Sequence, residues 1–447
     1  MSRIDWRDGL NLERDCSYIL REQEEVGVYF HTEKAYKFIE ELDNLKAEQE
    51  LIIRPFLGLF VEPLETKKDG EYSHVKKVFL KNGDYTSSVF NHYPDSFMDV
   101  EAPFSRVLIS EPSISQREKV INQLLKLGWK PTIFTEKGQP KLTSSGEPVE
   151  TLESVGDFGK ALSLWYIYNH RQSQIKGFID NVRDDHRIPS SVNSCATNTF
   201  RCAHRTVANI PRVTSVYGKE MRSLFGVKDG RRFVGADLSG LELRMLCHHM
   251  NDADYTAQVL TGDIHTYNME KAGLDNRNQA KTFIYGFLYG SGDSKTGSII
   301  GKGAKEGKAI KEKFFKEIPA LSDLVNKVKF IAEKYKFLPS IDNRKIYLRS
   351  YEGRLLIHTA LNCLLQANGS IIAKRAMVIA YNEIKRRGLD AKQVIFYHDE
   401  IDYDCSKECA DEVGKILIDS MRLAGEYYNL RIPISGEYNI GLDWSVH

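Results

Sequence analysis

Long hydrophobic runs, paired cysteines and an excess of one charge are all missing from this sequence. No apolar run approaches the roughly 20 residues that cross a bilayer, so we expect no membrane-spanning helix. The 7 cysteines are scattered without a C-x-x-C pair, which argues against a zinc site or a disulfide framework and for reduced thiols in the cytoplasm. The net charge is only +1, so any surface that binds nucleic acid must be a local one.

Length and composition indicate an ordinary globular protein with more than one domain. The chain has 447 residues, too many for one simple core, and 42% of them are hydrophobic and 28% charged. The charged first residues do not resemble a signal peptide. The spacing of apolar residues predicts helices within 12–50, over 115–127 and over 158–182.

Two basic stretches each allow two interpretations. The helix expected at 158–182 carries His170, Arg171 and Lys176 on one side, which could face a phosphate backbone or simply solvent. Residues 292–336 are rich in lysine above a periodic apolar pattern. These lysines could follow a nucleic-acid strand, or they could only increase solubility.

A third basic stretch, Arg277 to Gly290, carries a more specific pattern. Arg277, Lys281 and Tyr285 follow one another at intervals of four residues, which places them on one face of a helix. Two cations one turn apart repel unless an anion lies between them, and a triphosphate meets that need. The alternative is a solvated basic helix face.

Two aspartates stand where strands are expected to end. Asp237 follows the apolar run FVGA, and Asp399 lies between an apolar strand and a return strand in VIFYHDEIDYD. Carboxylates suit hard divalent cations, which take oxygen ligands, and two such ions can support phosphoryl transfer. Taken alone, each aspartate could equally be a cap or a turn residue.

Three segments together resemble the motifs of family A DNA polymerases, the DNA polymerase I family. They are ADLSGLELR at 236–244, R-x-x-x-K-x-x-x-Y-G-x-x-Y-G at 277–290 and YHDE at 397–400. Within the family, AKTFIYGFLYGSGD is similar to the replicative polymerases of short-tailed phages. The resemblance is dense from Arg201 onward and thin before Ser190.

The resemblance implies a mixed α and β (α+β) right-hand fold with an antiparallel palm sheet, helical fingers and a helical thumb. The thumb would span 1–185, with an inserted segment at about 55–105. The palm would be formed by 186–247 and 351–447, and the fingers by 248–350.

The resemblance also implies a role for individual residues. Asp237 and Asp399 would hold two Mg²⁺ ions, with the backbone carbonyl of Leu238 as a further ligand. Glu242 would block the position of a ribose 2′-hydroxyl and bond with Tyr285. The triphosphate of a dNTP would be held by His265, Arg277 and Lys281. Tyr285, where many relatives carry Phe, implies tolerance of dideoxynucleotides. The residues expected at primer–template DNA are Arg201, Asn362, Gln366 and His398.

The segment TFRCAHRTVANIP departs from the pattern that it resembles. Phe200 stands where the family usually has glycine, and the segment is shorter than in the phage relatives. We therefore expect the backbone to differ beside Arg201.

No proofreading exonuclease is expected in this chain. The D-x-E pair Asp69-Gly70-Glu71 lies in a polar run that is typical of an exposed turn. The exonuclease would then be a separate partner, or would have been removed. Residues 55–105, with an Asn82-Gly83 hairpin signal, stand where the relatives bind thioredoxin as a processivity factor, so a thioredoxin-like partner is a further hypothesis.

The function expected on these grounds is template-directed DNA synthesis in DNA replication, in the host cytoplasm if the protein is viral. A single-subunit RNA polymerase is one alternative, against which Glu242 argues. A non-catalytic DNA-binding accessory subunit is another, against which Asp237 and Asp399 argue, because a binding module needs no metal carboxylates.

Overall fold

The computed structural model describes residues 6–63, 74–75, 77–87, 104–105, 107–110, 113–144 and 146–446. The chain forms two compact units. Unit 1 comprises Met1–Ala35 and Lys176–His447, and unit 2 comprises Tyr36–Ile175. The predicted thumb, residues 1–185, therefore falls partly in each unit, and the domain names remain predictions. The pair Asp69 and Glu71 lies outside the described residues.

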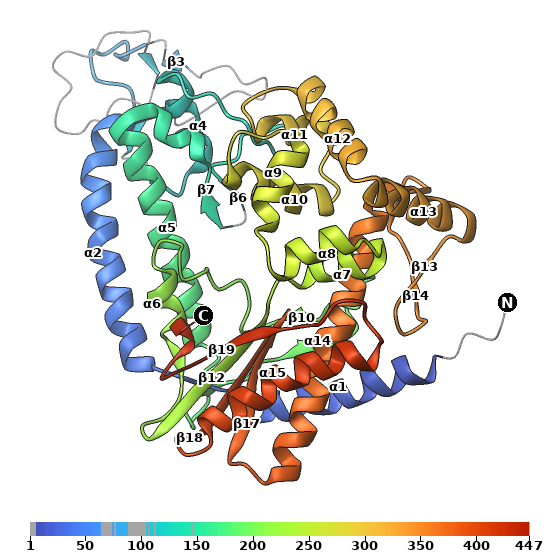
Figure 1. Cartoon of the computed structure of the whole chain (residues 1–447). Coiled ribbons are helices and arrows are strands. Elements are labelled where there is room, and N and C mark those ends of the chain that lie inside the picture. The colour runs from blue at the N-terminus through green and yellow to red at the C-terminus, as the bar shows by residue number, and fades with distance from the viewer. Residues whose placement is uncertain are drawn as a thin grey trace. The chain divides into compact units, whose positions relative to one another are not determined.

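Unit 1 is built on a four-stranded antiparallel sheet, as the predicted fold class requires (Figure 1). The strand order is β17 (Ala391–Tyr397), β18 (Glu400–Ser406), β12 (Arg231–Leu238) and β19 (Gly436–Gly441). Alternation sorts the side chains to two faces. Val234, Ala236 and Leu238 join the main hydrophobic core, whereas Asp237 reaches solvent on the opposite face.

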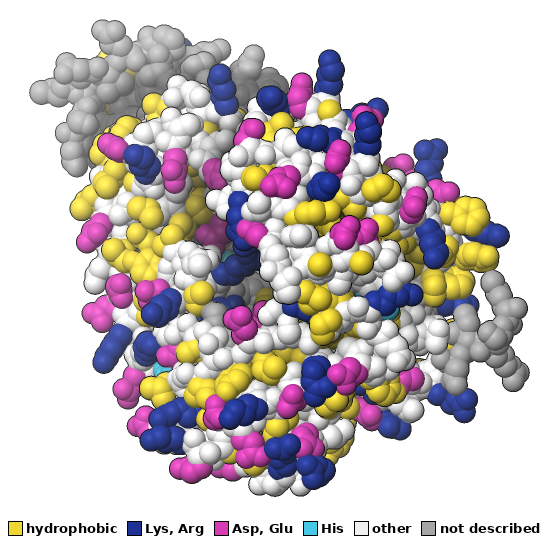
Figure 2. Space-filling model, in the orientation of Figure 1, with side chains coloured by type: hydrophobic (Ala, Val, Ile, Leu, Met, Phe, Trp, Pro, Cys, Tyr) yellow, Lys and Arg dark blue, Asp and Glu magenta, His cyan; other side chains and the backbone are white. Residues whose placement is uncertain are grey.

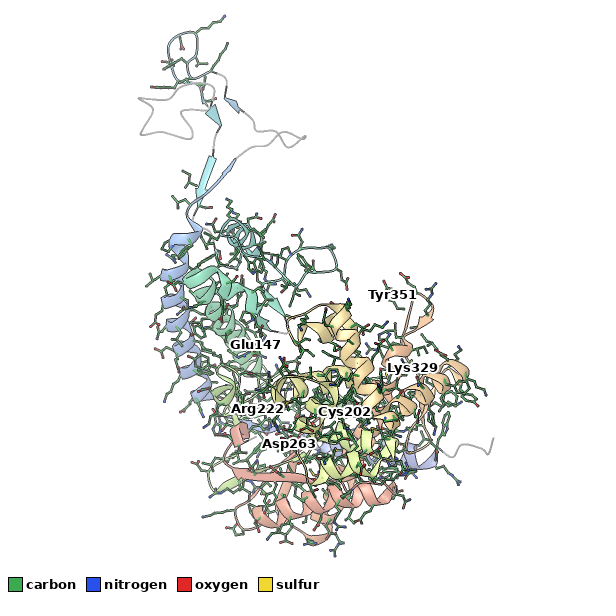
Figure 3. All side chains as sticks on the ribbon, turned by 45° about the horizontal axis from the view of Figure 1, so that its top comes forward. Glu147, Cys202, Arg222, Asp263, Lys329 and Tyr351 are labelled. Carbon is green, nitrogen blue, oxygen red and sulfur yellow. The ribbon has the colours of Figure 1, made fainter. Side chains whose placement is uncertain are left out.

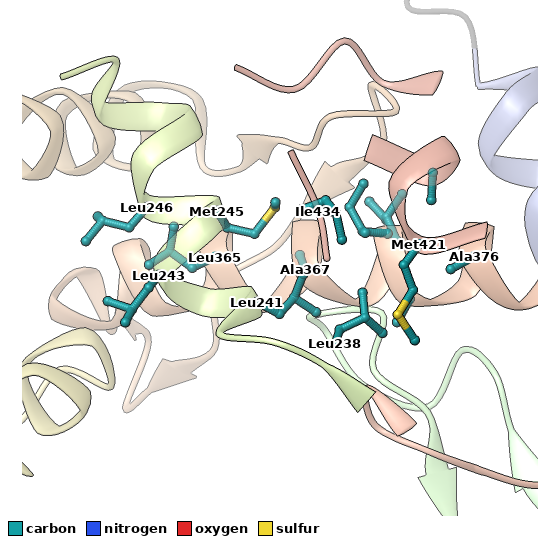
Figure 4. Packing of buried hydrophobic residues seen from close by; sticks show 14 of the residues in the cluster. Leu238, Leu241, Leu243, Met245, Leu246, Leu365, Ala367, Ala376, Met421 and Ile434 are labelled. Carbon is teal, nitrogen blue, oxygen red and sulfur yellow. The ribbon is translucent and has the colours of Figure 1, made fainter. Parts of the chain in front are cut away.

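Three helices supply the core against that face of the sheet. They are α7 (Leu241–Met250), α14 (Ala360–Arg387) and α15 (Ala410–Tyr427). Figure 4 shows Leu238 at the end of β12 close to Leu241 of α7, Ala367 of α14 and Met421 of α15. Because Leu238 is fully buried there, it anchors the end of β12, where the neighbouring Asp237 lies.

Six further helices precede α14 in the range predicted for the fingers. They are α8 (Ala253–Leu260), α9 (Ile264–Ala272), α10 (Arg277–Leu288), α11 (Asp293–Ser298), α12 (Ala304–Glu317) and α13 (Pro319–Tyr335). Asp263 caps α9 and Asn276 caps α10, each accepting hydrogen bonds from backbone N–H groups. The Phe283 ring of α10 packs edge-on against Phe314 of α12 at 5.1 Å, which joins these helices through a common core.

The first helix, α1 (Arg7–Val26), belongs to unit 1 and is tied to α14 by ion pairs. Glu13 accepts hydrogen bonds from Lys374, which is fully buried, and from Arg344, both at 2.6 Å. Asp8 pairs with Arg375 at 2.7 Å. Removing Glu13 would leave a buried ammonium without its carboxylate, which is strongly destabilising.

Short strands and turns complete unit 1. They are β1 (Val28–Phe30), β8 (Arg187–Ile188), β9 (Val192–Asn193), β10 (Ala203–His204), α6 (Gly218–Arg222), β11 (Phe225–Gly226), β13 (Leu338–Pro339), β14 (Lys345–Ile346), β15 (Ser350–Tyr351), β16 (Arg354–Leu355), η2 (Ile357–Thr359) and η3 (Trp444–Val446).

Unit 2 has its own core between three helices. They are most of α2 (Thr32–Leu57), α4 (Arg117–Lys126) and most of α5 (Gly156–Ile179), and they agree with the predicted helices. Buried Leu124, Leu162 and Trp165 belong to this core. The shorter elements are β2 (Phe60–Pro63), β3 (His74–Val75), β4 (Phe104–Ser105), β5 (Val107–Ser110), β6 (Thr143–Ser144), β7 (Glu147–Pro148) and η1 (Glu150–Val155). None of the described helices is long and apolar enough to cross a membrane.

The structure of unit 2 decides two predictions, one about a hairpin turn and one about Arg171. The hairpin turn is present, because Gly83 has a φ of +90° and Phe79 pairs with Tyr85 across the turn. Arg171 faces neither a free phosphate-binding surface nor solvent. It is 1% exposed and forms an ion pair with Glu147.

Candidate active site

Asp237 and Asp399 come together at one end of the four-stranded sheet. Asp237 is opposite Glu400 in the β12–β18 register, and Asp399 precedes Glu400 in the turn from β17. The backbone N–H of Leu238 donates to the carbonyl of Asp399 at 3.1 Å, which joins the two segments at this point. His398, in the same turn, has a φ of +61°, a conformation that is uncommon for a residue with a side chain and concentrates at functional sites.

The surroundings of both carboxylates favour their uncharged forms. Partial burial, with the nearby charge of Asp399, raises the pKa of Asp237 to about 7. Burial and the charge of Glu242 raise the pKa of Asp399 to about 6, although Arg201 opposes this. Within the described part of the chain, neither side chain forms an ion pair, and Arg201 acts on Asp399 only from beyond ion-pair distance.

This donor set fits divalent cations. Carboxylate and carbonyl oxygens are the ligands that Mg²⁺ prefers, and Mg²⁺ keeps several sites for water and substrate oxygens. Among the described residues, no cluster of three or more His, Cys, Asp or Glu side chains forms a complete cage. Two acidic side chains without a cation therefore suit a metal that is shared with a substrate.

The acidic residues of strand β18 have arginine neighbours at both ends of the strand. Asp404 pairs with Arg187 at 2.6 Å and also with Arg231. Glu400 accepts a hydrogen bond from Trp444 and lies 3.9 Å from Arg222. Asp402, between them on the same face, is completely buried. Its hydrogen-bonding neighbour among the described residues is the Glu400 carboxyl, which can bond it only when one of the two acids is protonated.

Asp402→Asn is expected to make stability less dependent on pH. Burial and the charge of Glu400 raise the pKa of Asp402 well above its usual range. A raised pKa in the folded state gives stability that is present at low pH and is lost as pH rises through that pKa. Thermal unfolding in a chelator should therefore show a smaller fall from pH 5 to pH 9 in the variant than in the wild type.

Asp404→Asn is the matched control on the same face of β18. Asp404 has two arginine partners, so its replacement should lower the unfolding temperature. It should not reduce the loss of stability at high pH, as Asp402→Asn should. Equal pH profiles for the wild type and Asp402→Asn would contradict the interpretation of Asp402.

Glu242 is held in place by two side chains. Arg201 donates to its carboxylate at 2.9 Å, and the Tyr289 hydroxyl donates to the same oxygen at 3.3 Å. The bond expected from Tyr285 is therefore made by Tyr289, one helical turn further along. Tyr285 lies near Glu242, whose charge, after burial, raises the Tyr285 pKa. Tyr289 was missed because spacing alone does not decide which of two tyrosines on one helix face reaches a neighbouring helix.

The backbone before Arg201 takes the conformation that glycine favours. Phe200 has a φ of +58°, a left-handed conformation that is strained for a residue with a side chain. Its carbonyl accepts a hydrogen bond from Ser370 at 2.8 Å, and the Arg344 guanidinium lies over its ring at 4.3 Å. These contacts hold Phe200 in a conformation that a glycine would adopt without strain, and the expected difference from the relatives' backbone stays a prediction.

The cations proposed for the triphosphate lie close together on α9 and α10. The rings of His265 and Tyr285 are 6.3 Å apart. Burial, followed by the charges of Arg277 and Lys281, lowers the His265 pKa. Arg277 donates to Asp263 at 2.8 Å, whereas exposed Lys281 has no ion-pair partner among the described residues. Asp263, labelled in Figure 3, was missed because its pairing depends on how two helices meet.

The proposed DNA-contacting side chains meet at a narrow cavity beside Asp399. Asn362 and Gln366 are the two incompletely buried positions between 360 and 374 on α14, and they lie on one helix face. The cavity, about 10 Å³ in volume, is lined partly by Gln366, Arg201, Glu242, His398 and Asp399. Asn362 lies on the helix face next to it.

Comparisons with known proteins agree with this arrangement. The sequence profile of "DNA polymerase family A" matches residues 110–446. The chain is 34% identical over 388 residues to a DNA-directed DNA polymerase of Enterobacteria phage T3, covering 77% of this chain and 54% of that protein. It is 33% identical over 390 residues to the corresponding protein of Escherichia phage T7, with the same coverage. The chain thus spans about half the length of these relatives.

The fold is also that of a solved polymerase domain. A structure described as the POL domain of Pol1 from M. smegmatis, in complex with DNA primer-template and dNTP, superimposes with a TM-score of 0.76. The identity is 19%, and the match covers 97% of this chain and 70% of that one. The sequence profile covers most of the chain and includes both aspartates, Glu242 and the α10 cations. The chain therefore belongs to DNA polymerase family A.

Proposed function

We propose that this protein is a template-directed DNA polymerase that adds dNTPs to the 3′ end of a primer. The observation that carries the proposal is the pair Asp237 and Asp399, which are adjacent and partly buried and form no ion pair with the described residues. The cationic face of α10 and the buttressed Glu242 lie in the same unit. The phage relatives are named DNA-directed DNA polymerases.

The reaction joins one nucleotide and releases pyrophosphate. The primer 3′-oxygen forms a bond to the α-phosphorus of the dNTP, the bond to the β-phosphate oxygen breaks, and the hydroxyl proton passes to water. Lys281, His265 and Arg277 would bind the triphosphate and orient it. Because Arg277 is paired with Asp263, it would have to exchange one anion for another. Positioning of this kind supplies a large part of the rate.

Asp237, Asp399 and the Leu238 carbonyl would hold two Mg²⁺ ions. When bound, these ions would lower the pKa of the 3′-hydroxyl and stabilise the leaving pyrophosphate. The protein residues fix where the ions would be held, because Leu238 is anchored in the core and the turn that carries Asp399 is hydrogen-bonded to Leu238. Gln366 and Asn362 would contact the minor groove, where acceptors are common to all base pairs.

Glu242→Ala is expected to weaken discrimination against ribonucleotides. The ion pair with Arg201 and the bond from Tyr289 fix the carboxylate in one place, where it would crowd a 2′-hydroxyl. We expect the ratio of kcat/KM for dNTP over rNTP to fall by about tenfold or more, which corresponds to ~1.4 kcal/mol. Glu270→Ala, an exposed change on α9, should leave the ratio unchanged.

The direct test of the function is extension of a labelled primer on a DNA template with Mg²⁺. Extension with dNTPs but poorly with rNTPs supports a DNA polymerase. Equal use of rNTPs would favour the single-subunit RNA polymerase. Binding of primer–template without any extension would favour a non-catalytic accessory subunit.

A separate exonuclease and a thioredoxin-like processivity factor are further proposals, as is a cytoplasmic site of action. They rest on the resemblance alone. Affinity capture with the full chain tests them, and processivity unchanged by added thioredoxin would remove the second.

A further inference from the structure

An exposed surface at the end of α13 alternates aromatic rings with cations. We call it the aromatic–basic surface and define it by Phe330, Lys334, Tyr335, Phe337, Lys345 and Tyr347. These residues lie on α13, on the β13–β14 hairpin and in the segments that flank it. Figure 2 shows hydrophobic and basic side chains next to each other over α13.

The rings and cations form a continuous series. Lys334 lies 5.5 Å from the Phe330 ring and 5.2 Å from the Tyr335 ring. The Tyr335 and Phe337 rings are 6.4 Å apart, and the Phe337 and Tyr347 rings are 6.3 Å apart. Lys345 lies over the Phe337 ring at 4.8 Å. Each ring therefore has a cation or another ring beside it.

The rings are not simply parts of the core. Phe330 is 59% exposed and Tyr347 is 57% exposed, which is unusual for such large side chains. Tyr351, on the β15–β16 hairpin, is 68% exposed. Figure 3 labels Tyr351 and also Lys329 of α13. Exposed aromatic side chains grouped in this way mark a binding surface.

The surface is strongly basic although the whole chain is not. Residues 327–354 contain eight Lys and Arg against three Asp and Glu, a charge of +5, whereas the entire chain carries +1. Arg344 is used internally by Glu13 and Asp342. In the described part of the chain, the other seven cations, Lys327, Lys329, Lys334, Lys336, Lys345, Arg349 and Arg354, form no ion pair.

We propose that the aromatic–basic surface binds single-stranded DNA, namely the unpaired template that has not yet been copied. Single-stranded DNA exposes base faces, which stack on aromatic rings, and phosphates, which attract lysines. A duplex hides its base faces and would use the cations alone. An acidic peptide likewise needs the cations but not the exposed rings. The inference deepens the proposed polymerase function by assigning a site to one strand of its substrate.

The test compares ring and charge variants of the full chain on defined probes. Binding of a labelled oligothymidylate of about 16 nucleotides is measured by fluorescence anisotropy over a range of salt. Phe330→Ala with Tyr347→Ala should weaken binding by about tenfold or more. Lys334→Gln with Lys345→Gln should weaken it and reduce the salt slope by about 1.4.

Matched controls separate this surface from general changes. Tyr18→Ala removes a 63% exposed ring that also has a lysine, Lys385, at 5.8 Å, but lies on α1. It should not alter oligothymidylate binding, and neither should Lys407→Gln, an exposed change after β18. Thermal unfolding should be the same for all variants and the wild type.

A second readout separates this proposal from the polymerase function. On a primer–template with an overhang of one nucleotide, the ring variants should incorporate a dNTP as the wild type does. Lengthening the overhang to about 12 unpaired nucleotides should tighten primer–template binding by the wild type but not by the ring variants. Weaker oligothymidylate binding supports the surface even if no extension is ever seen. Unchanged binding in the ring variants, with loss only in the lysine variants, overturns the proposal and indicates a surface for an acidic partner.

Discussion

Replacing Asp399 with asparagine is expected to lower primer extension by at least about a thousandfold. Asparagine keeps the size of the side chain but removes the charge that would hold a divalent cation. A metal contributes several kcal/mol of transition-state stabilisation, and each ~1.4 kcal/mol is tenfold in rate. Asp237→Asn should have the same effect, since both carboxylates face the same ions. Single-turnover extension at saturating DNA and dNTP measures the loss.

The stability of the same variants should change in the opposite direction. In the metal-free protein, Asp237 and Asp399 are partly buried and form no ion pair with the described residues, so removing either charge relieves repulsion between acidic side chains. We expect a higher unfolding temperature in a chelator and unchanged DNA binding. Asp411→Asn, at the surface on α15 and paired with Lys415, is the control for a lost carboxylate. Extension by Asp399→Asn within tenfold of the wild type would show that this pair is not the catalytic centre.

Lys281→Ala is the second change with a large expected effect. Lys281 is exposed and free of ion pairs among the described residues, close to His265 and Arg277. Truncating one partner of a charge-assisted contact typically costs about 2–5 kcal/mol, so kcat/KM for dNTP should fall by about 100-fold. Most of the loss should appear in KM if Lys281 acts mainly in binding.

The control for this change is Lys271→Ala on the adjacent helix α9. Lys271 is paired with Glu317 at 3.5 Å and should affect dNTP use little. Primer–template affinity should be the same in both variants. A loss of DNA affinity in Lys281→Ala, without a change in dNTP use, would place the cation on the DNA and not on the triphosphate.

Much of the fold was predictable because the spacing of apolar residues along the chain indicates which face of a helix or strand is buried. The alternation of Ile401 and Tyr403 against Asp402 and Asp404 predicted a strand with one apolar face, and β18 has that arrangement. The helix from Arg277 was predictable from its spacing, and Asn276 caps it. Both patterns lie within one short segment, so they can be recognised from the sequence alone.

The contacts that were not predicted depend on the angles between elements. Asp263 reaches Arg277 across 14 residues, and Tyr289 rather than Tyr285 reaches Glu242 across 47. Arg171 resembled a surface cation by pattern, but the β6–β7 hairpin brings Glu147 to it. Phe200 shows the reverse case, in which contacts from Ser370 and Arg344 keep a backbone conformation that the residue itself disfavours.

The discontinuity of unit 1 determines the order in which the nascent chain can fold. Helix α1 leaves the ribosome before the rest of unit 1, yet its partner Lys374 is made more than 350 residues later, and β12 must wait for β18 and β19. Unit 2 is one continuous segment, so its core can form while α1 still exposes its apolar face. At about 5–20 residues per second, that wait lasts tens of seconds. A chaperone that covers α1 during this wait would therefore protect its apolar face until Lys374 and its neighbours have been made.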